Sequence, residues 1–375
     1  MNVPTYDVAI VGLGAMGGAA AFHLARRGTR VLGLDRFAPP HALGSSHGET
    51  RIIREAYFED PRYVPIVQRA YELWRELEKV AGERLLIETG GLMVGPPDGV
   101  VVGGAKASAD THRLPYEWLE AAALRRRFPA LTPDDDTVAV WEPRAGALFP
   151  EACVRAHLAL AADFGADLRM DEAVLSWRPD GGGYEVTTSR GRHRASRLVL
   201  AANAWLPRLL PGVSLPLTVT RQPLFWFANH DPIERLAPGR LPVYIWERGP
   251  DLFFYGFPAF DGELKVARHM GGRASDPDAI DRTVGEEESG PHRAFLDACI
   301  PGASGAFRRG VVCMYANTPD GHFVIDRHPE HAEVLILSAC SGHGFKFSCA
   351  IGEIAAQLLL EGDTPHDLGL FRLRW

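Results

Sequence analysis

Residues 6–28 read YDVAIVGLGAMGGAAAFHLARRG, and this stretch decides the fold. Its first seven residues form a largely apolar run of the kind found in buried parallel strands. The small residues that follow, closed by Gly28, indicate a helix. Residues 29–35, TRVLGLD, have the pattern of a second strand. The start of the chain therefore predicts a β-α-β unit.

Three glycines in the turn after the first strand form the pattern G-x-G-x-x-G of a Rossmann-type nucleotide site. Gly12 would permit the tight turn, Gly14 would let the backbone approach a pyrophosphate, and Gly17 would let the helix pack on the strand. Asp35 ends the second strand and suits a ribose hydroxyl, and its charge argues against a 2'-phosphate. Arg36 follows it in the same predicted cofactor site. The alternative is that the glycines serve helix packing alone.

The glycine pattern occurs with both NAD and FAD. Apolar strands predicted at 198–204 and 334–339 can both return to the first sheet, so the nucleotide domain would be split along the chain. The segment SGHGFKFS, residues 341–348, ends a strand and opens a helix, so its backbone N–H groups could reach a second position on the ligand. This split arrangement favours FAD. From this segment we assign three residues to the cofactor: Gly344, Phe345 and Lys346.

Composition and charge exclude several classes of protein. The 375 residues are 46% hydrophobic and 23% charged, as in ordinary globular proteins. A net charge of −7 argues against nucleic-acid binding. We find no apolar run of membrane-spanning length and no leader segment, so we expect a cytoplasmic protein with no membrane partner. The five cysteines form no C-x-x-C pair, which predicts neither disulfides nor a metal site.

The pattern of elements along the chain predicts two interleaved domains. Residues 116–129, YEWLEAAALRRRFP, are expected to be a helix stopped by the proline, whereas residues from about 215 are rich in β pattern. We expect a mixed α/β fold in which a Rossmann-type FAD-binding domain is interleaved with an antiparallel β-sheet substrate domain. The FAD-binding domain would comprise 1–84, 146–214 and 305–375, and the substrate-binding domain 85–145 and 215–304.

Five stretches of the sequence carry a resemblance to a known family. They are YDVAIVGLGAMG, GSSHGETRIIREAY, YGFPAF with LKVARH, CMYANTPDGHFVID and SGHGFKFS, and they lie in order from residue 6 to about 350. Together they resemble the monomeric sarcosine oxidases and N-methyltryptophan oxidases. The resemblance implies a monomer with FAD attached through a cysteine thioether. It also implies oxidation of an N-methyl group or ring C–N bond of a secondary amino acid, with oxygen reduced to hydrogen peroxide.

The same resemblance assigns flavin contacts. Cys313 matches the cysteine that bonds the 8α carbon of the flavin, and its alternative is a small buried core residue. His47 and Arg51 match residues against the flavin ring. Lys265 matches the lysine that promotes reaction with oxygen, although a lysine on a strand is usually solvated. The chain departs from the family at Ser46, often histidine, and at Glu49, often aspartate.

Substrate contacts follow in the same way. Arg54 and Lys346 match two cations that bind the substrate carboxylate; without the resemblance, Arg54 would be expected to pair with Glu49 or Glu55 at the surface. Tyr255, His269 and Tyr315 match residues that line the substrate pocket. His269 lies four residues after Lys265, so both side chains would share one face of a strand, and Tyr255 on the preceding strand could join them.

The expected activity is oxidative demethylation of sarcosine or a related N-methyl amino acid, which with oxygen would be the partners of the protein. The predicted catalytic residues are Lys265, Arg51, His47, His269 and Tyr255. The alternatives are an oxidase of proline or pipecolate, an NAD-dependent dehydrogenase, and a non-catalytic flavin-binding subunit.

Overall fold

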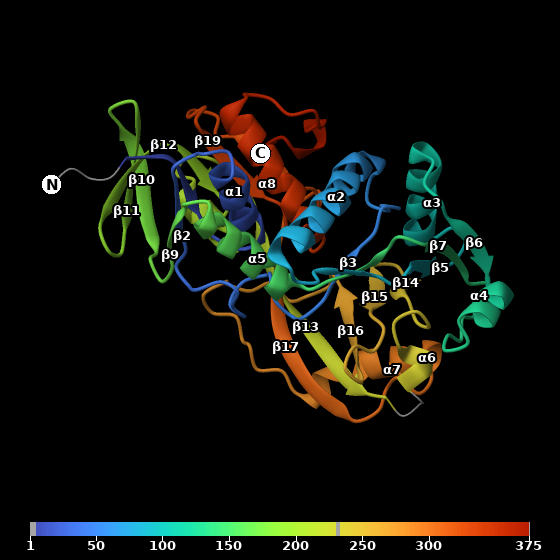
Figure 1. Cartoon of the computed structure of the whole chain (residues 1–375). Helices are drawn as coiled ribbons and strands as arrows, with labels where there is room; N and C mark the ends of the chain where they lie inside the picture. Colours follow the sequence, from blue (N-terminus) through green and yellow to red (C-terminus); the bar gives the residue numbers. More distant parts are fainter. Residues whose placement is uncertain (1–4, 230–232, 375) are drawn as a thin grey trace.

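A computed structural model describes residues 5–229 and 233–374, which form two eight-stranded sheets and one small sheet (Figure 1). The predicted β-α-β unit lies at the centre of the first large sheet. There β1 (Thr5–Val11) pairs in parallel with β2 (Val31–Leu34) on one side and with β12 (Arg192–Leu200) on the other. β19 (Val334–Ser338) pairs in parallel with β12. The predicted return of two distant segments to the first sheet is therefore confirmed. The remaining strands are β9 (Asp167–Arg169), β10 (Val174–Asp180), β11 (Gly183–Thr188) and β18 (Val324–Arg327).

Helices from four parts of the chain cover this sheet (Figure 1). They are α1 (Ala15–Ala25), α2 (Val64–Ala81), α5 (Pro150–Asp163) and α8 (Ser348–Leu360). α1 and α8 pack closely because small residues meet between them: a Cβ atom at Gly352 would lie 2.6 Å from the Cβ of Ala19. The Glu353 carboxylate pairs with Arg69 at 2.7 Å and so ties α8 to α2. Within the described ranges, no helix combines the length and the apolar character needed to cross a membrane.

The second large sheet has the order β17-β13-β16-β15-β14-β5-β7-β6. Its neighbouring strands are antiparallel, apart from β14 and β5, which run in parallel. α7 (Gly290–Cys299) covers one face, where the rings of Phe254 and Phe295 stack 4.4 Å apart. The strands are β5 (Gly91–Gly95), β6 (Glu117–Glu120), β7 (Val138–Glu142), β13 (Thr218–Ala228), β14 (Val243–Gly249), β15 (Leu252–Gly256), β16 (Glu263–His269) and β17 (Phe307–Asn317). The other helices here are α3 (Val100–His112), α4 (Ala121–Arg127) and the short α6 (Ile233–Leu236).

The small third sheet has the order β3-β8-β4, with β3 (Arg51–Ile53), β8 (Gly146–Leu148) and β4 (Leu86–Glu88). Short 3-10 turns complete the described secondary structure at Pro61–Tyr63, Asn203–Leu209, Glu286–Ser289, Phe345–Phe347 and Gly369–Phe371.

Two predicted elements are wrong in part. The helix expected over 116–128 begins only at Ala121, because Glu117–Glu120 forms β6 and pairs with β7. Pairing at the edge of a sheet overrides local helix propensity there, and Leu119 alone of the four strand residues is buried. The strand expected over 198–204 ends at Leu200, and a 3-10 turn begins at Asn203 with a positive φ of 48°.

β17 connects the two predicted domains. It lies inside the range 305–375 that we assigned to the nucleotide domain, yet it pairs along its length with β13 of the second sheet. Figure 1 shows these two long strands running side by side below the first sheet. The division into two domains stays a prediction, with β17 at their junction.

Candidate active site

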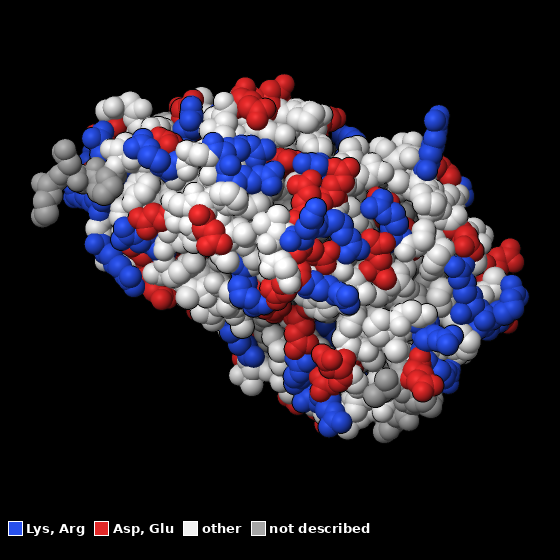
Figure 2. Space-filling model, viewed as in Figure 1, with Lys and Arg blue, Asp and Glu red and all other residues white. Residues whose placement is uncertain are grey.

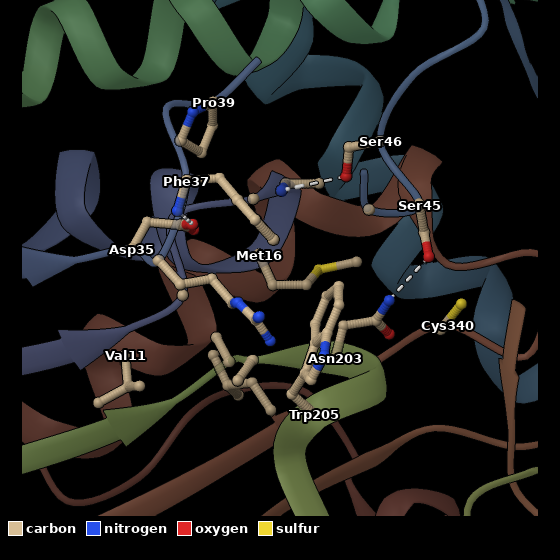
Figure 3. Close-up of a pocket in the computed structure, with 18 of the residues that line it drawn as sticks. Val11, Met16, Asp35, Phe37, Pro39, Ser45, Ser46, Asn203, Trp205 and Cys340 are labelled. Carbon is tan, nitrogen blue, oxygen red and sulfur yellow. Dashed lines mark hydrogen bonds between the residues drawn. The ribbon is translucent and has the colours of Figure 1, made fainter. Parts of the chain in front are cut away.

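A cavity of about 440 Å³ opens where β1 and β2 end, the usual ligand position in parallel α/β sheets (Figure 3). This volume lies within the range of small-molecule and cofactor sites. The cavity is also lined by the loop after β2 and by residues that follow β12 and β19. Eight of the predicted site residues line it: Gly12, Gly14, Asp35, Arg36, Arg51, Tyr315, Gly344 and Phe345.

The three glycines of the turn have different roles. Gly12 has a φ of +95°, and a Cβ atom there would lie 2.6 Å from the carbonyl oxygen of Ala201. A Cβ atom at Gly17 would collide with the carbonyl oxygen of Gly12, so this glycine serves helix packing. At Gly14 the nearest atom to a Cβ would be the Ser46 hydroxyl oxygen, 3.8 Å away. Protein packing therefore does not require Gly14 to be glycine, and its backbone stays open to the cavity.

Asp35 joins the turn to the loop after β2. Its carboxylate accepts the backbone N–H groups of Leu13 at 2.7 Å and of Phe37 at 2.8 Å, and burial raises its pKa. Figure 3 shows the Asp35 side chain at the edge of the cavity. The guanidinium of Arg36 pairs with Asp278 at 2.9 Å, which brings a segment of the second sheet's connections over this end of the cavity.

Side chains on one face of the second sheet gather at the other end of the cavity. The register places Tyr255 on β15 opposite Ala267 on β16, between Lys265 and His269. The predicted shared face is therefore confirmed, since side chains of a strand alternate. His269 Nδ1 lies 3.4 Å from the hydroxyl oxygen of Tyr315 on β17. Burial lowers the pKa of His269 to about 4 and raises that of both tyrosines.

Cys313 is two residues before Tyr315 on β17 and shares its side of the strand. Its thiol is buried, and the guanidinium of Arg51 donates to its Sγ at 3.4 Å. The backbone carbonyl oxygen of Ser45 lies 3.6 Å from the same Sγ. A cation and a thiol thus meet beside the cavity that Arg51 lines.

Lys265 is a buried cation whose partners come from the loop after β2. Its Nζ donates to the carbonyl oxygens of Gly48 at 2.6 Å and Thr50 at 2.8 Å, and to the Thr50 hydroxyl at 3.1 Å. Burial, and then the charge of Arg51, lower its pKa well below the usual value. The alternative of a solvated strand lysine is wrong, because only 3% of the residue is exposed. His47, from the same loop, is also buried, and burial followed by Arg51 lowers its pKa to about 4.

Arg54 and Lys346 lie over one aromatic ring. The Tyr57 ring centroid is 4.1 Å from the Arg54 guanidinium carbon and 5.1 Å from the Lys346 Nζ. Arg54 pairs at 2.6 Å with Glu59, so the expected surface pair with Glu49 or Glu55 does not form. Its Nε is buried without a hydrogen-bond partner among the described residues.

The charges around this ring are strongly coupled. Burial would raise the pKa of Glu59, but the charges of Arg54, His343 and Lys346 together outweigh burial, and the pKa falls to about 2. Burial, and then Arg54, lower the pKa of Lys346 to about 7. The Lys346 Nζ donates to the carbonyl oxygen of His343 at 2.8 Å. The charges of Glu59, Lys346 and Arg54 all act on His269, which links this cluster to the face of the second sheet.

Comparison with known proteins identifies the family. A family model described as FAD dependent oxidoreductase matches residues 7–358. The chain belongs to the FAD dependent oxidoreductases. It is similar to monomeric sarcosine oxidase from Streptomyces avermitilis, with 46% identity over 372 residues that cover 98% of this chain and 97% of that protein. It is 34% identical over 371 residues to N-methyl-L-tryptophan oxidase from Yersinia pestis, covering 98% of each chain.

A solved structure resembles this FAD dependent oxidoreductase over nearly its whole length. NikD, an unusual amino acid oxidase essential for nikkomycin biosynthesis, matches with a TM-score of 0.86 at 27% identity, covering 99% of this chain and 98% of that one. The prediction of an FAD-dependent amine oxidase family is therefore confirmed.

The residues present fit the FAD of this family. Gly14 leaves backbone open at the start of α1, and Asp35 presents a carboxylate at the end of β2. At the other end of the cavity, Arg51 brings a cation close to where the isoalloxazine ring is expected. Of the predicted residues outside the cavity lining, Cys313 joins this end through Arg51 and His269 joins it through Tyr315.

Several residues of this oxidoreductase's site escaped sequence reasoning. Glu59 holds Arg54, Tyr57 lies under both cations, and Asn203 donates its side-chain N–H to the Ser45 hydroxyl at 2.7 Å (Figure 3). Glu151 accepts the backbone N–H of Gly48 at 2.6 Å. Glu59 is only five residues from Arg54 along the chain, but the two side chains meet only because the chain turns between them. Glu151 lies 103 residues from Gly48 along the chain, so no local pattern relates the two.

Proposed function

We propose that this FAD dependent oxidoreductase is an oxidase of N-methyl amino acids and that sarcosine is its substrate. The observation that carries the proposal is the pair of buried cations, Arg54 and Lys346, over the ring of Tyr57 beside the face that holds His269. The identity to monomeric sarcosine oxidase, 46%, supports sarcosine above larger N-methyl amino acids. The balanced reaction converts sarcosine, oxygen and water to glycine, formaldehyde and hydrogen peroxide.

The two cations bind the substrate carboxylate in this proposal. Arg54 offers its partner-free Nε, and Lys346 adds a point charge. Fixing the carboxylate orients the N-methyl group, which is a proximity effect. His269, with a pKa of about 4, is neutral near pH 7 and can accept a hydrogen bond from the substrate amine. Tyr255 and Tyr315 keep their hydroxyl protons, because burial raises both pKa values.

Bound FAD supplies the acceptor of two electrons, which oxygen finally receives. The chain's own part is to place cations, Arg51 and Lys265, where negative charge develops. We infer that Cys313 Sγ forms a thioether with the 8α carbon of the flavin. The bond replaces the thiol hydrogen and one 8α hydrogen, and oxygen takes up both as hydrogen peroxide.

A peroxide-coupled screen tests the substrate. Purified protein is given sarcosine, N-methyl-L-alanine, N-methyl-L-tryptophan, proline and pipecolate at equal concentration, and formaldehyde is measured in parallel. We expect equal amounts of peroxide and formaldehyde with sarcosine, and smaller rates with larger N-methyl amino acids. Peroxide with proline or pipecolate alone would replace the proposal by a cyclic imino acid oxidase. A flavin-loaded protein that makes no peroxide with any of them would contradict the oxidase itself.

The carboxylate site predicts a pH dependence. Lys346 is charged below a pKa of about 7 and neutral above it, so a carboxylate ligand binds most tightly below pH 7. Above pH 7, the affinity falls by up to about tenfold per pH unit, because one proton is taken up with the ligand. Methoxyacetate, which has no amine to titrate, is the probe, and its dissociation constant is read from the flavin absorption spectrum.

The variant that tests this pH dependence is Lys346→Met. It removes a charge-assisted hydrogen bond worth about 1.5–3 kcal/mol, so we expect methoxyacetate affinity and kcat/KM for sarcosine to fall about 10- to 150-fold below pH 7. The pH dependence of methoxyacetate binding should disappear with it. A variant that keeps the wild-type pH profile would show that Lys346 does not bind the carboxylate.

A cytoplasmic monomer is the state we infer for this enzyme. The relative's name describes it as monomeric. All five cysteines are free thiols in the structure, which suits a reducing compartment. On the face drawn in Figure 2, basic and acidic side chains are interspersed, as suits a protein without a nucleic-acid partner. Light scattering after size-exclusion chromatography should give the mass of one chain.

A further inference from the structure

Residues 48–50 have an unusual backbone. Gly48 has a φ of +99° and Glu49 a φ of +69°. A non-glycine residue in this left-handed region is uncommon and is strained unless its surroundings hold it there. Gly48 also has no room for a side chain, since a Cβ atom would lie 2.6 Å from Leu224 Cδ1. The segment therefore needs partners that fix its shape.

Two side chains hold this segment from opposite sides. The Glu151 carboxylate accepts the N–H of Gly48 at 2.6 Å and that of Glu49 at 3.1 and 3.2 Å. The Lys265 ammonium donates hydrogen bonds to the carbonyl oxygens of Gly48 and Thr50 and to the Thr50 hydroxyl. The three hydrogen-bond acceptors of Lys265 among the described residues thus belong to the segment whose N–H groups Glu151 binds.

Glu151 is itself held by a rigid element. It is the second residue of α5, directly after Pro150, and it lies in the first helical turn. The positive end of the helix dipole favours a carboxylate at this position. α5 packs against α1 of the first sheet. The carboxylate therefore connects residues 48–50 to the part of the molecule that bears the cofactor cavity.

We propose that Glu151 is a positioning residue for the oxygen reaction: it fixes residues 48–50, and these fix the Lys265 ammonium. The role of Lys265 rests on the proposed function, whereas the hydrogen bonds that Glu151 accepts from Gly48 and Glu49 do not. The negative charges of Glu151 and Glu49 also favour the protonated form of Lys265, against its burial.

The test uses the flavin-loaded enzyme, wild type and Glu151→Ala, with two measurements. Hydrogen exchange of the peptide that covers residues 46–52 reports the segment. Reoxidation of dithionite-reduced flavin by oxygen in a stopped-flow instrument reports Lys265, and it needs no amino acid substrate. We expect the variant to exchange the two amides at least about tenfold faster and to reoxidise about tenfold more slowly, since it loses the charged acceptor of both N–H groups. Flavin reduction by sarcosine should change much less.

Two further variants complete the design. Glu151→Gln keeps an oxygen acceptor, so it should restore most of both properties. Glu78→Ala is the matched control, because the Glu78 carboxylate also accepts two successive N–H groups, from Leu85 at 2.8 Å and Leu86 at 2.9 Å, but is not among the hydrogen-bond partners of residues 48–50 or of Lys265. It should lower Tm without slowing reoxidation.

Three results would overturn the positioning role. The first is hydrogen exchange in Glu151→Ala that is unchanged from wild type. The second is faster exchange in Glu151→Ala together with a wild-type rate of flavin reoxidation. The third is slow reoxidation in Glu151→Gln while the two amides stay protected from exchange. The last would mean that the carboxylate acts by charge alone. Wild-type enzyme that makes no peroxide with any amino acid would contradict the proposed function, while exchange and reoxidation would still decide the role of Glu151.

Discussion

Two thiols near the cavity differ in their surroundings, and this difference bears on which of them anchors the cofactor. Cys313 Sγ receives a hydrogen bond from the Arg51 guanidinium, which places a cation beside the sulfur. Cys340 lines the cavity and accepts the backbone N–H of Ala316 at 3.4 Å, and burial raises its pKa. Position alone would allow either thiol, and the neighbouring Arg51 cation supports our proposal that Cys313 is the anchor.

The prediction is that Cys313→Ser abolishes covalent attachment and Cys340→Ser does not. After precipitation with acid, the yellow colour should stay with wild-type and Cys340→Ser protein and move to the supernatant for Cys313→Ser. The absorption spectrum of each fraction measures this. Retention of flavin by denatured Cys313→Ser protein would remove Cys313 as the anchor.

Residue roles were predictable from the sequence only where geometry is local or a motif is shared. Strand alternation placed Lys265 and His269 on one face, and the register confirms it. The partner of Arg54 was not predicted, because the chain has to fold back on itself between residues 54 and 59 to bring Glu59 to the guanidinium. Glu151 depends wholly on the tertiary packing of α5.

At the scale of elements, the segment 270–285, here called the strap, lies at one end of the cavity, which its residue Asp278 lines. Arg282 donates to the carbonyl oxygen of Leu43 at 2.7 Å, in the loop after β2. Asp278 accepts hydrogen bonds from Arg36 at 2.9 Å, from the Trp205 indole at 2.7 Å and from Arg208. The Asp278 carboxylate therefore ties the strap to two walls of the cavity.

Removing this tie should loosen the cofactor. In a Cys313→Ser background, Asp278→Ala should release FAD at least about fivefold faster, as expected for the loss of one charge-assisted network at a half-exposed site. The recovery of FAD fluorescence after dilution measures the rate. Asp276→Ala is the control for the rest of this network, because that carboxylate lies 3.3 Å from Arg208 and accepts the backbone N–H of Asp278 at 2.9 Å but does not line the cavity. Equal release from both variants would mean that the strap does not retain FAD.

Elements with long, one-sided patterns were predictable and a short edge strand was not. The β-α-β unit needs only a buried apolar run and three glycines, which the first 35 residues contain. β6 is four residues long and carries Glu, Trp, Leu and Glu, a composition equally suited to a helix. Its pairing with β7 depends on the sheet already being present.

At the scale of the whole molecule, buried histidines make stability depend on pH. His292 is 5% exposed between the rings of Phe225 and Phe254, and neither ring nitrogen has a partner among the described residues. Burial lowers its pKa to about 4. The unfolded chain takes up protons near pH 6.5 and the folded chain does not, so stability is complete above pH 6.5 and is lost as pH falls through about 4. Other buried histidines with lowered pKa add to this: His23, His47, His157, His269 and His343.

The variant His292→Leu isolates one such contribution. Between pH 4.5 and 6, the free energy of unfolding of this variant should fall less steeply than that of the wild type, by about 1.4 kcal/mol per pH unit. At pH 7 the variant should be about 1–3 kcal/mol more stable, because a polar ring without partners leaves the core. Urea titrations across this range measure both. Parallel curves for the two proteins below pH 6 would contradict the buried neutral histidine.

The order in which the first sheet is assembled has a consequence for synthesis on the ribosome. β1 is synthesised before the elements that it packs with. Its neighbour β12 pairs on its other side with β19, which ends at Ser338. The helix α1 packs against α8, which ends at Leu360. A nascent chain therefore holds the glycine turn long before the walls around it exist. We therefore expect cofactor capture only after α8 has been made, and products truncated before this helix should appear in cells as colourless, unloaded chains.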